Sequence, residues 1–599
     1  MNSKKWFITA GMAAIFSVIA ILAFNVIEDP FGVFGDEWYS YNETNNPRVA
    51  KIEYLKKNHE KYDSYVIGCS STSSYPVAEL NKYMDAKFYN MIMYGADMLD
   101  VEQTVYYLTN NYEVKNIFLN VYIANGYYYD YEPNKMTDSM HYLADGSSKL
   151  KFYSKYLFAN PQYAYAKFCA KRNDRYLAES FDVFDEETGA YDKRKRDAEH
   201  ITDMAEYYKA YPIFADYPKT EYHITKAKET GGSLLRIKEF CDEKGVNLIV
   251  ANAPIYYDYF NCIPKEEVKE FYKTLADNID FWDFSVSSVS LEPRYFYDET
   301  HFRNDVGRMA LAKIFGDSSV YVPEDFGTYV TKDNVSDYVE TFYGKTYSDE
   351  NYTKKLPVLL YHHISEDVAN EDIVSPKKFE EHMRAISESG YTAVTIDDVT
   401  AYIEKGAELP EKAVLITLDD GYMSNYDYAY PILKKYGLKG TIFAVGSTFG
   451  SDTYKDTGKK IFPHFGFNEM AEMEKSGVAE VLSHSYDMHQ SAAYEPNEAY
   501  ENVLMHKGEK DEEYVRRIND DVQKWEEKIG KPIKAIAFPH GESDMFAQAV
   551  LNENGVKLTF STNGKTDTLI KGLPQSGYAM GRYTITEDMS AEDVLAMIQ

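Results

Sequence analysis

The sequence predicts an α/β protein with an N-terminal transmembrane helix, a first α/β domain and a second domain built as a (β/α) barrel. Residues 6–27 are uncharged and largely apolar. Strand-like and helix-like segments then alternate along most of the chain. After residue 356, three strand-like segments end in acidic or imidazole side chains. This pattern is typical of a barrel whose site lies on the rim at the C-terminal ends of its strands.

The uncharged segment 6–27 is long enough to cross a membrane, because about 22 helical residues cover roughly 33 Å. Lys4 and Lys5 precede it and two acidic residues follow it, which places the N-terminus in the cytoplasm. A cleaved signal peptide is the alternative, but no small-residue cleavage site stands near the end of the segment. We therefore expect residues 1–28 to form a single-pass anchor in the cell membrane, with both domains extracytoplasmic.

Composition limits the partners and the chemistry. The formal net charge of −31 at pH 7 excludes nucleic acid and anionic membrane surfaces as partners. The chain of 599 residues is long enough for two or three domains. Its four cysteines all lie in the first half and form no disulfide framework.

The first chemical motif lies at the end of the strand-like segment 413–420. The segment is apolar and rich in β-branched residues, as buried parallel strands are. It ends in Asp419 and Asp420, which Gly421 follows. Adjacent carboxylates repel each other, and a metal beside them is one way to keep both ionised.

Two further segments bring imidazoles to predicted strand ends. His484 follows the strand-like residues 480–482, and His489 comes five positions later. On a helix that spacing would separate the two side chains by roughly 140°, so we expect a strand end and a loop instead. The third segment, 535–541, ends in a Pro-His-Gly turn that contains His540.

Together these motifs resemble the NodB-type polysaccharide deacetylases, carbohydrate esterase family 4. The family patterns T-F-D-D-G, H-[ST]-x-x-(x)-H and Pro-Tyr-Gly correspond here to Thr417-Leu-Asp-Asp-Gly421, His484-Ser-Tyr-Asp-Met-His489 and Phe538-Pro-His-Gly-Glu542. Leu418 replaces the usual Phe, and His540 the usual Tyr. The histidine spacing and the segment 359–364 are most similar to the exported poly-N-acetylglucosamine deacetylases.

The resemblance implies a distorted (β/α)7 barrel over residues 356–599 and a hydrolase of linear amide bonds. It implies a divalent metal, most often zinc, held by Asp420, His484 and His489. It also implies roles for four further residues: Asp419 as the base, His362 as the acid, Arg582 as the partner that orients Asp419, and the backbone N–H near His540 as an oxyanion donor. His363 is the alternative acid. Poly-N-acetylglucosamine, peptidoglycan and chitin oligomers all stay open as substrates.

The first domain carries a second motif. The segment 62–73 has the pattern of a strand that runs into a turn of small residues, where Ser70 is either an exposed nucleophile or a helix cap. Near the end of the domain, Asp298 and His301 stand three apart. Together these segments resemble the SGNH (GDSL-like) hydrolases, which implies an α/β/α domain over residues 29–320.

Carried over residue by residue, this second resemblance makes Ser70 the nucleophile, His301 its base and Asp298 the residue that orients His301. It also makes Gly95 an oxyanion-hole donor through its backbone N–H. Cys69 stands where the family commonly has Asp, and Asn120 and Asn125 both compete for the place of the family's Asn. The Ser-Ser form is closer to proteins of cell-surface polymer acylation than to secreted lipases, which implies an esterase or O-acyltransferase.

Two functional hypotheses follow. In the first, a membrane-anchored enzyme removes N-acetyl groups from a surface or biofilm polysaccharide and carries a second serine site. In the second, the chain is a glycan-binding or scaffold protein of a polysaccharide synthesis or export complex, with an inactive SGNH-like domain. In both, residues 130–222 are expected as an insertion in the first domain and residues 321–355 as the linker.

Overall fold

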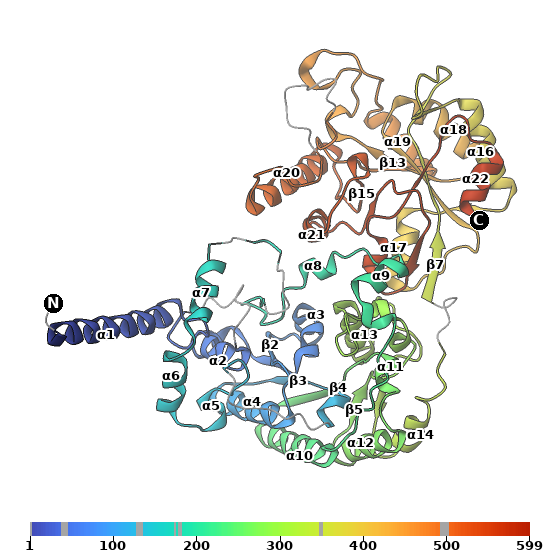
Figure 1. Cartoon of the computed structure of the whole chain (residues 1–599). Coiled ribbons are helices and arrows are strands. Elements are labelled where there is room, and N and C mark those ends of the chain that lie inside the picture. Colours follow the sequence, from blue (N-terminus) through green and yellow to red (C-terminus); the bar gives the residue numbers. More distant parts are fainter. Residues whose placement is uncertain are drawn as a thin grey trace. The chain divides into compact units, whose positions relative to one another are not determined.

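The computed structural model describes residues 3–36, 46–126, 136–172, 175–177, 183–346, 352–490 and 502–599. The chain forms two compact units (Figure 1). Unit 1 comprises residues 1–193, 211–317 and 322–347, and unit 2 comprises residues 194–210, 318–321 and 348–599. Both units are mixed α/β structures.

Unit 1 is built on a six-stranded sheet with the order β2-β1-β3-β4-β5-β6. The first five of these strands pair in parallel, and β6 joins the edge antiparallel. The strand order reverses between β1 and β3, and in open α/β sheets ligands bind outside the carboxyl ends of the strands at such a switch point. The strands are β1 (Ser64–Gly68), β2 (Phe88–Ile92), β3 (Asn116–Val121), β4 (Asn247–Asn252), β5 (Phe281–Asp283) and β6 (Thr328–Val330).

Helices connect these strands, as a doubly wound sheet requires. Leu234, Ile237 and Cys241 are buried at helical spacing, which turns one face of the helix at 227–244 toward the core. The main helices are α2 (Pro47–Asn58), α3 (Val77–Met84), α4 (Met98–Asn111), α10 (Ala227–Lys244), α12 (Lys265–Asn278) and α13 (Asn304–Phe315).

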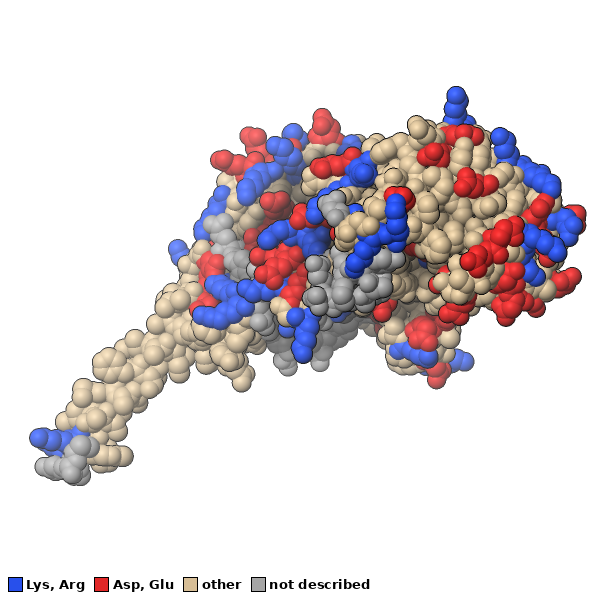
Figure 2. Space-filling model, turned by 90° about the horizontal axis from the view of Figure 1, so that it is seen from above, with Lys and Arg blue, Asp and Glu red and all other residues tan. Residues whose placement is uncertain are grey.

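Helix α1 (Ser3–Glu28) is long and apolar enough to span a membrane, with a mean hydropathy of 2.4 over its most apolar window. Its surface in Figure 2 is uncharged except for the lysines near its N-terminal end. At the other end, Asn25 Nδ2 donates to the carbonyl oxygens of Leu157 and Ala159, at 3.1 and 2.8 Å. Leu157 is the last residue of α6 (Lys149–Leu157), and Ala159 lies between α6 and α7 (Pro161–Ala170).

Unit 2 is built on a curled sheet of parallel strands with the order β16-β15-β14-β13-β12-β8-β18. A single bridge between Phe560 and Met580 joins the two edges of this sheet. The strands are β8 (Val358–Tyr361), β12 (Ala413–Asp420), β13 (Gly440–Ala444), β14 (Ala479–Ser483), β15 (Ala535–Ala537), β16 (Leu558–Phe560) and β18 (Tyr583–Thr584). The strand-like segments expected before the Asp-Asp, His484 and Pro-His-Gly motifs are confirmed as β12, β14 and β15.

Amphipathic helices follow most of these strands. Ser375 and Thr395 cap two of them through hydrogen bonds to backbone N–H groups. The helices are α16 (Pro376–Glu388), α17 (Ile396–Lys405), α18 (Tyr430–Tyr436), α19 (Phe467–Ser476), α20 (Asp511–Ile529), α21 (Met545–Glu553) and α22 (Ala591–Ile598). An antiparallel pair, β7 (Thr353–Leu356) and β17 (Asp567–Ile570), lies outside the main sheet.

Two segments differ from the expected domain layout. Residues 328–340, expected within the linker, form β6 and α14 (Val335–Glu340) of unit 1, because Val330, Val335 and Val339 are buried there. Residues 194–210, expected within the first domain, belong to unit 2. These residues include α8 (Arg194–Asp197) and α9 (Met204–Ala210).

Candidate functional site

The predicted metal ligands Asp420, His484 and His489 lie together at the carboxyl ends of β12 and β14. Asp420 Oδ1 is 3.7 Å from His484 Nε2 and 3.6 Å from His489 Nε2. One donor atom from each of the three residues lies within 4.8 Å of the others. Ligands of a tetrahedral zinc ion, with bonds near 2.0–2.1 Å, are separated by roughly 3.3–3.5 Å. The donor set and its spacing therefore fit a divalent ion such as zinc.

The hydrogen bonding of His484 leaves its Nε2 available to bind a metal ion. Its Nδ1–H donates to the carbonyl oxygen of Ala537 at 2.8 Å, which leaves the lone pair of Nε2 toward Asp420. Burial lowers the pKa of His484 to about 4. The imidazole is therefore neutral at pH 7, as a metal ligand must be.

Asp419 lies beside this group, buried and paired with Arg582. The guanidinium donates from Nη1 to Asp419 Oδ1 and from Nη2 to Oδ2, each at 2.7 Å. Burial would raise the pKa of Asp419, but the positive charge of Arg582 opposes this effect and that pKa is lowered. Because a two-point contact fixes the plane of a carboxylate, Arg582 fixes the orientation of the Asp419 side chain.

The structure distinguishes His362 from His363. Burial opposes the ionised form of Asp420, but His489, His362 and His484 outweigh it and hold the pKa of Asp420 well below its usual value. The buried Nδ1 of His362 has no hydrogen-bond partner among the described residues. His363 instead pairs its Nδ1 with Ser424 Oγ at 2.8 Å and stacks on Phe462. Of these two histidines, His362 therefore has a ring nitrogen without a hydrogen-bond partner among the described residues, and it lies beside Asp419 and Asp420.

His540 lies in the turn after β15, and its ring centroid is 4.4 Å from that of His489. Burial and the two neighbouring imidazoles, His489 and His484, lower the pKa of His540 to about 4. A neutral imidazole thus stands at the position where the family has a tyrosine.

Backbone strain gathers around the site. Asp420, Ser485 and His540 have φ values of 72°, 68° and 59°, in the left-handed region that side chains other than glycine rarely adopt. Such conformations persist when the surrounding structure imposes them, and they cluster at functional sites. The three left-handed residues lie at or next to the predicted metal ligands, as expected for a functional site.

Asp521 supports the loop of the candidate site, and the motif comparison missed it. Its carboxylate accepts from the backbone N–H groups of Tyr486 and Asp487, each at 2.8 Å, so it fixes the loop between His484 and His489. Burial raises the pKa of Asp521 to about 6. One feature of the sequence could have indicated this role: Asp521 is a carboxylate within the apolar stripe of α20.

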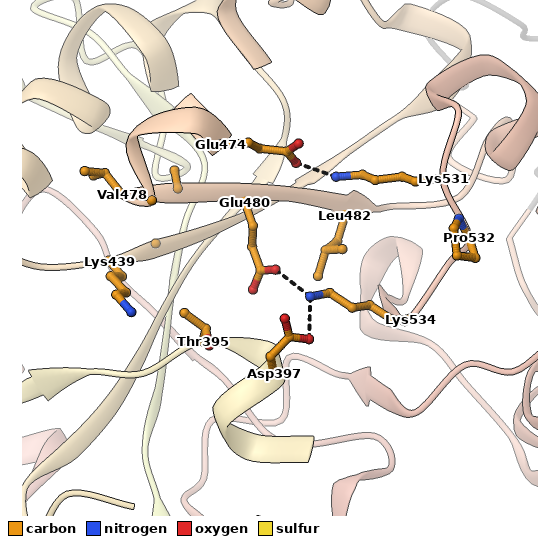
Figure 3. Close-up of a pocket in the computed structure, with 13 residues that line it drawn as sticks. Thr395, Asp397, Lys439, Glu474, Val478, Glu480, Leu482, Lys531, Pro532 and Lys534 are labelled. Carbon is orange, nitrogen blue, oxygen red and sulfur yellow. Dashed lines mark hydrogen bonds and ion pairs between the residues drawn. The ribbon is translucent and has the colours of Figure 1, made fainter. Parts of the chain in front are cut away.

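The cavity drawn in Figure 3 lies at the opposite end of the strands. It has a volume of about 530 Å³ and is lined by residues at the start of β13 and β14. Lys534 pairs with Asp397 and Glu480, and Lys531 pairs with Glu474 (Figure 3). Sites in barrels of this kind lie at the carboxyl ends of the strands, so we assign this cavity no part in the chemistry.

In unit 1 the structure brings Ser70, His301 and Asp298 together. Ser70 follows β1 at the switch point of the sheet, and its Oγ is 2.6 Å from His301 Nε2. His301 Nδ1 is 2.8 Å from both carboxylate oxygens of Asp298. Burial would raise the pKa of Asp298, but the hydrogen bond from His301 outweighs it and lowers that pKa. This is the arrangement of a serine nucleophile, a base and an orienting carboxylate.

The two asparagines considered for this site have different partners. Asn120 Nδ2 donates to Ser71 Oγ at 2.9 Å, whereas Asn125 Nδ2 donates to the carbonyl oxygen of Ala96 at 3.3 Å. Asn125 therefore stands next to the turn at Gly95, which has a φ of 49°.

Comparison with known proteins yields a family match within unit 2 and several similar proteins. A family model described as polysaccharide deacetylase matches residues 406–565. The poly-beta-1,6-N-acetyl-D-glucosamine N-deacetylase of Staphylococcus aureus (strain MRSA252) is 27% identical over 219 residues, which are 36% of this chain and 68% of that protein. The protein YxkH of Bacillus subtilis (strain 168) is 39% identical over 133 residues, 22% of this chain and 43% of YxkH. The chain thus spans less than half the length of YxkH.

Two solved structures were also matched. IcaB from Ammonifex degensii has a TM-score of 0.34 and 25% identity, over 41% of this chain and 97% of that one. A de-N-acetylase from Aggregatibacter actinomycetemcomitans has a TM-score of 0.35 and 22% identity, over 41% and 100% of the two chains.

The matched range 406–565 contains five of the site residues, Asp419, Asp420, His484, His489 and His540. The family match and the donor set coincide in the same strands. The C-terminal region of this chain is a polysaccharide deacetylase domain.

Proposed function

We propose that unit 2 hydrolyses the acetamide groups of an N-acetylhexosamine polysaccharide outside the cytoplasm. The observation that carries this proposal is the group Asp420, His484 and His489, with the Asp419–Arg582 pair directly beside it. The polysaccharide deacetylase match over residues 406–565 supports it.

The proposed substrate is a poly-β-1,6-N-acetylglucosamine-like glycan. Its support is the activity after which the Staphylococcus aureus relative is named, and that relative aligns over 36% of this chain. Peptidoglycan and chitin oligomers carry the same acetamide and are the alternatives that the experiment below separates.

The proposed mechanism assigns each side chain one task. When bound by Asp420, His484 and His489, a divalent ion supplies Lewis acidity toward the acetyl carbonyl and acidifies water. Asp419, oriented by Arg582, takes the proton as water oxygen adds to the acetyl carbon. The backbone N–H near His540 stabilises the oxyanion. His362 then gives a proton to the nitrogen as the C–N bond breaks, which leaves acetate and a free amine.

We also propose that α1 anchors the chain in the cell membrane, with both units on the outer side and a polysaccharide synthesis or export complex as neighbour. The support is the uncharged segment 6–27 within α1 and the two lysines, Lys4 and Lys5, that precede this segment.

Acetate release by the full-length chain in detergent tests the deacetylase proposal. With β-1,6-linked N-acetylglucosamine oligomers we expect release that a chelator abolishes and added zinc restores. Chitin oligomers and peptidoglycan fragments are assayed in parallel. Release from one of these alone would replace the proposed substrate. No release and no zinc bound would overturn the catalytic proposal and favour the glycan-binding scaffold.

A second candidate function concerns unit 1. We propose that Ser70, His301 and Asp298 form a serine esterase or O-acyltransferase site for ester groups on a surface glycan. The specific support is the 2.6 Å contact between Ser70 Oγ and His301 Nε2. In such a site His301 takes the serine proton while Ser70 Oγ attacks the acyl carbon, and His301 then gives that proton to the sugar oxygen that leaves as the ester C–O bond breaks.

A serine-reactive fluorophosphonate tests this second proposal. We expect the full-length chain to be labelled once, and the variants Ser70→Ala and His301→Ala to lose the label, because the serine is nucleophilic only with its base. Ser73→Ala, a change at a buried serine of the same turn, is the matched control. A chain that does not react, or one in which Ser70→Ala still reacts, would leave unit 1 without this activity.

A further inference from the structure

Residues 194–210 belong to unit 2, although the residues that precede and follow them in the sequence belong to unit 1. We call residues 194–210 the crossing segment. Its helix α8 contacts α21 (Figure 1). Asn552 Nδ2 donates to the carbonyl oxygen of Asp197 at 3.4 Å, and Ala198 and Ile201 are buried. The crossing segment is thus a packed part of the deacetylase unit.

The crossing segment supplies a hydrogen bond to a buried carboxylate. Thr202 Oγ1 donates to Asp567 Oδ1 at 2.6 Å, and Thr202 and Asp567 are 5% and 2% exposed. Next to this bond, Lys565 Nζ is 3.7 Å from Asp567 Oδ1 and 3.6 Å from Asp203 Oδ2. A buried carboxylate keeps its charge only when such partners replace the lost water.

The other oxygen of Asp567 holds the backbone next to Arg582. Gly581 N–H donates to Asp567 Oδ2 at 2.6 Å. A Cβ at Gly581 would meet the carbonyl oxygen of Lys565 at 2.7 Å, so this backbone is closely packed. Gly564 N–H donates to the carbonyl oxygen of Arg582 at 3.1 Å. The chain on both sides of the Arg582 Cα is therefore fixed.

Arg582 connects this fixed backbone to Asp419, the proposed base. Its guanidinium holds both oxygens of Asp419 at 2.7 Å. A series of direct contacts thus runs from Thr202 through Asp567 and Gly581 to Arg582 and Asp419.

We propose that Thr202 is a positioning residue for deacetylation, so that a segment of the N-terminal half supports the deacetylase site. The inference rests on the proposed function of unit 2. Without the hydroxyl, Asp567 loses the short hydrogen bond to its Oδ1 and keeps the ion pair with Lys565. The carboxylate is then less firmly held, and the backbone at Gly581 that it binds through Oδ2 loosens. The two-point contact of Arg582 with Asp419 then no longer fixes the base. A base displaced by about 1 Å costs up to about a hundredfold in rate.

The test uses the full-length zinc-loaded chain with Thr202→Val, which keeps the shape and removes the hydroxyl, and Thr202→Ser, which keeps the hydroxyl. We expect kcat for acetate release to fall about tenfold in the valine variant, with KM within about twofold. The serine variant is expected to behave like the wild type. Thr202→Ala serves as the loss variant if valine prevents folding.

A second readout does not depend on activity. Hydrogen exchange at the Gly581 amide is expected to be faster in Thr202→Val than in the wild type. The matched control is Thr441→Val, since Thr441 is a buried threonine whose Oγ1 lies 3.3 Å from Glu480 Oε1 at the opposite end of the strands. This control is expected to change neither kcat nor exchange at Gly581.

The outcomes separate the two proposals. A wild-type chain that releases no acetate from any glycan overturns the proposed function, whereas the exchange measurement still decides the role of Thr202. Unchanged exchange at Gly581 in Thr202→Val overturns the inference. So does a serine variant as slow as the valine variant, because the hydroxyl would then not be the group that matters.

Discussion

Deacetylation by the Asp420→Asn variant is expected to fall by on the order of a thousandfold, with loss of the bound zinc. The amide keeps the size of the carboxylate but removes the negative charge that His484 and His489 face at 3.7 and 3.6 Å. A bound divalent ion contributes several kcal/mol to such a reaction, and about 1.4 kcal/mol corresponds to a tenfold change in rate. Under the proposed mechanism, we therefore expect the charge of Asp420 to set both metal affinity and rate.

Two measurements check this expectation in the full-length chain. They are kcat/KM for acetate release and the zinc content after dialysis. The matched control is Asp397→Asn, the same change at the carboxylate that pairs with Lys534 at the other end of the barrel, at 2.7 Å. The control is expected to retain zinc and activity. An Asp420→Asn variant that keeps both would show that the ion binds elsewhere.

The Arg582→Met variant is expected to lose about 3–5 kcal/mol of unfolding free energy in unit 2 and most of its deacetylase activity. Arg582 is fully buried, and Asp419 is 2% exposed. Methionine is of similar length but leaves the carboxylate with no countercharge, and an uncompensated buried charge costs about that much. For a unit of this size, the loss corresponds to a fall in the unfolding temperature of roughly 6–20 °C.

Calorimetry of the full-length chain measures this fall. The double variant Arg582→Met, Asp419→Leu removes both charges at similar volume and is expected to regain stability without regaining activity, since a buried pair replaced by apolar side chains is often neutral in stability. A single variant as stable as the wild type would contradict the argument. A double variant no more stable than the single one would contradict it as well.

The motifs at strand ends could be predicted from the sequence because they depend on local pattern. An apolar β-branched run that ends in Asp419 and Asp420 identifies both the strand and its polar end. The carboxyl ends of parallel strands meet at one edge of a sheet, so the strand-like run before His484 is enough to predict that this imidazole lies beside the two aspartates. The membrane-length helix follows from composition in the same way.

The choice between His362 and His363 needed the tertiary structure. Neighbouring residues of a strand point to opposite faces, and the sequence does not say which face lines the site. The fold turns His363 to Ser424 and Phe462. It leaves His362 beside Asp419 and Asp420.

The left-handed backbone at Asp420, Ser485 and His540 also lay beyond the sequence, because none of these residues is a glycine and only the surrounding packing imposes that conformation. The layout of the two units differs from the expected one for a related reason.

Thr202 and Asp567 are 365 positions apart. A hydrogen bond between such distant residues produces no periodic pattern in the sequence of either segment. The sequence by itself determined the strand-end motifs and the apolar helix, since each depends on neighbours within a few positions, and the resemblance of those motifs to a known family supplied the proposed ligand set. Only the tertiary structure decided which side chains support that ligand set, because their contacts exist only once distant segments are packed together.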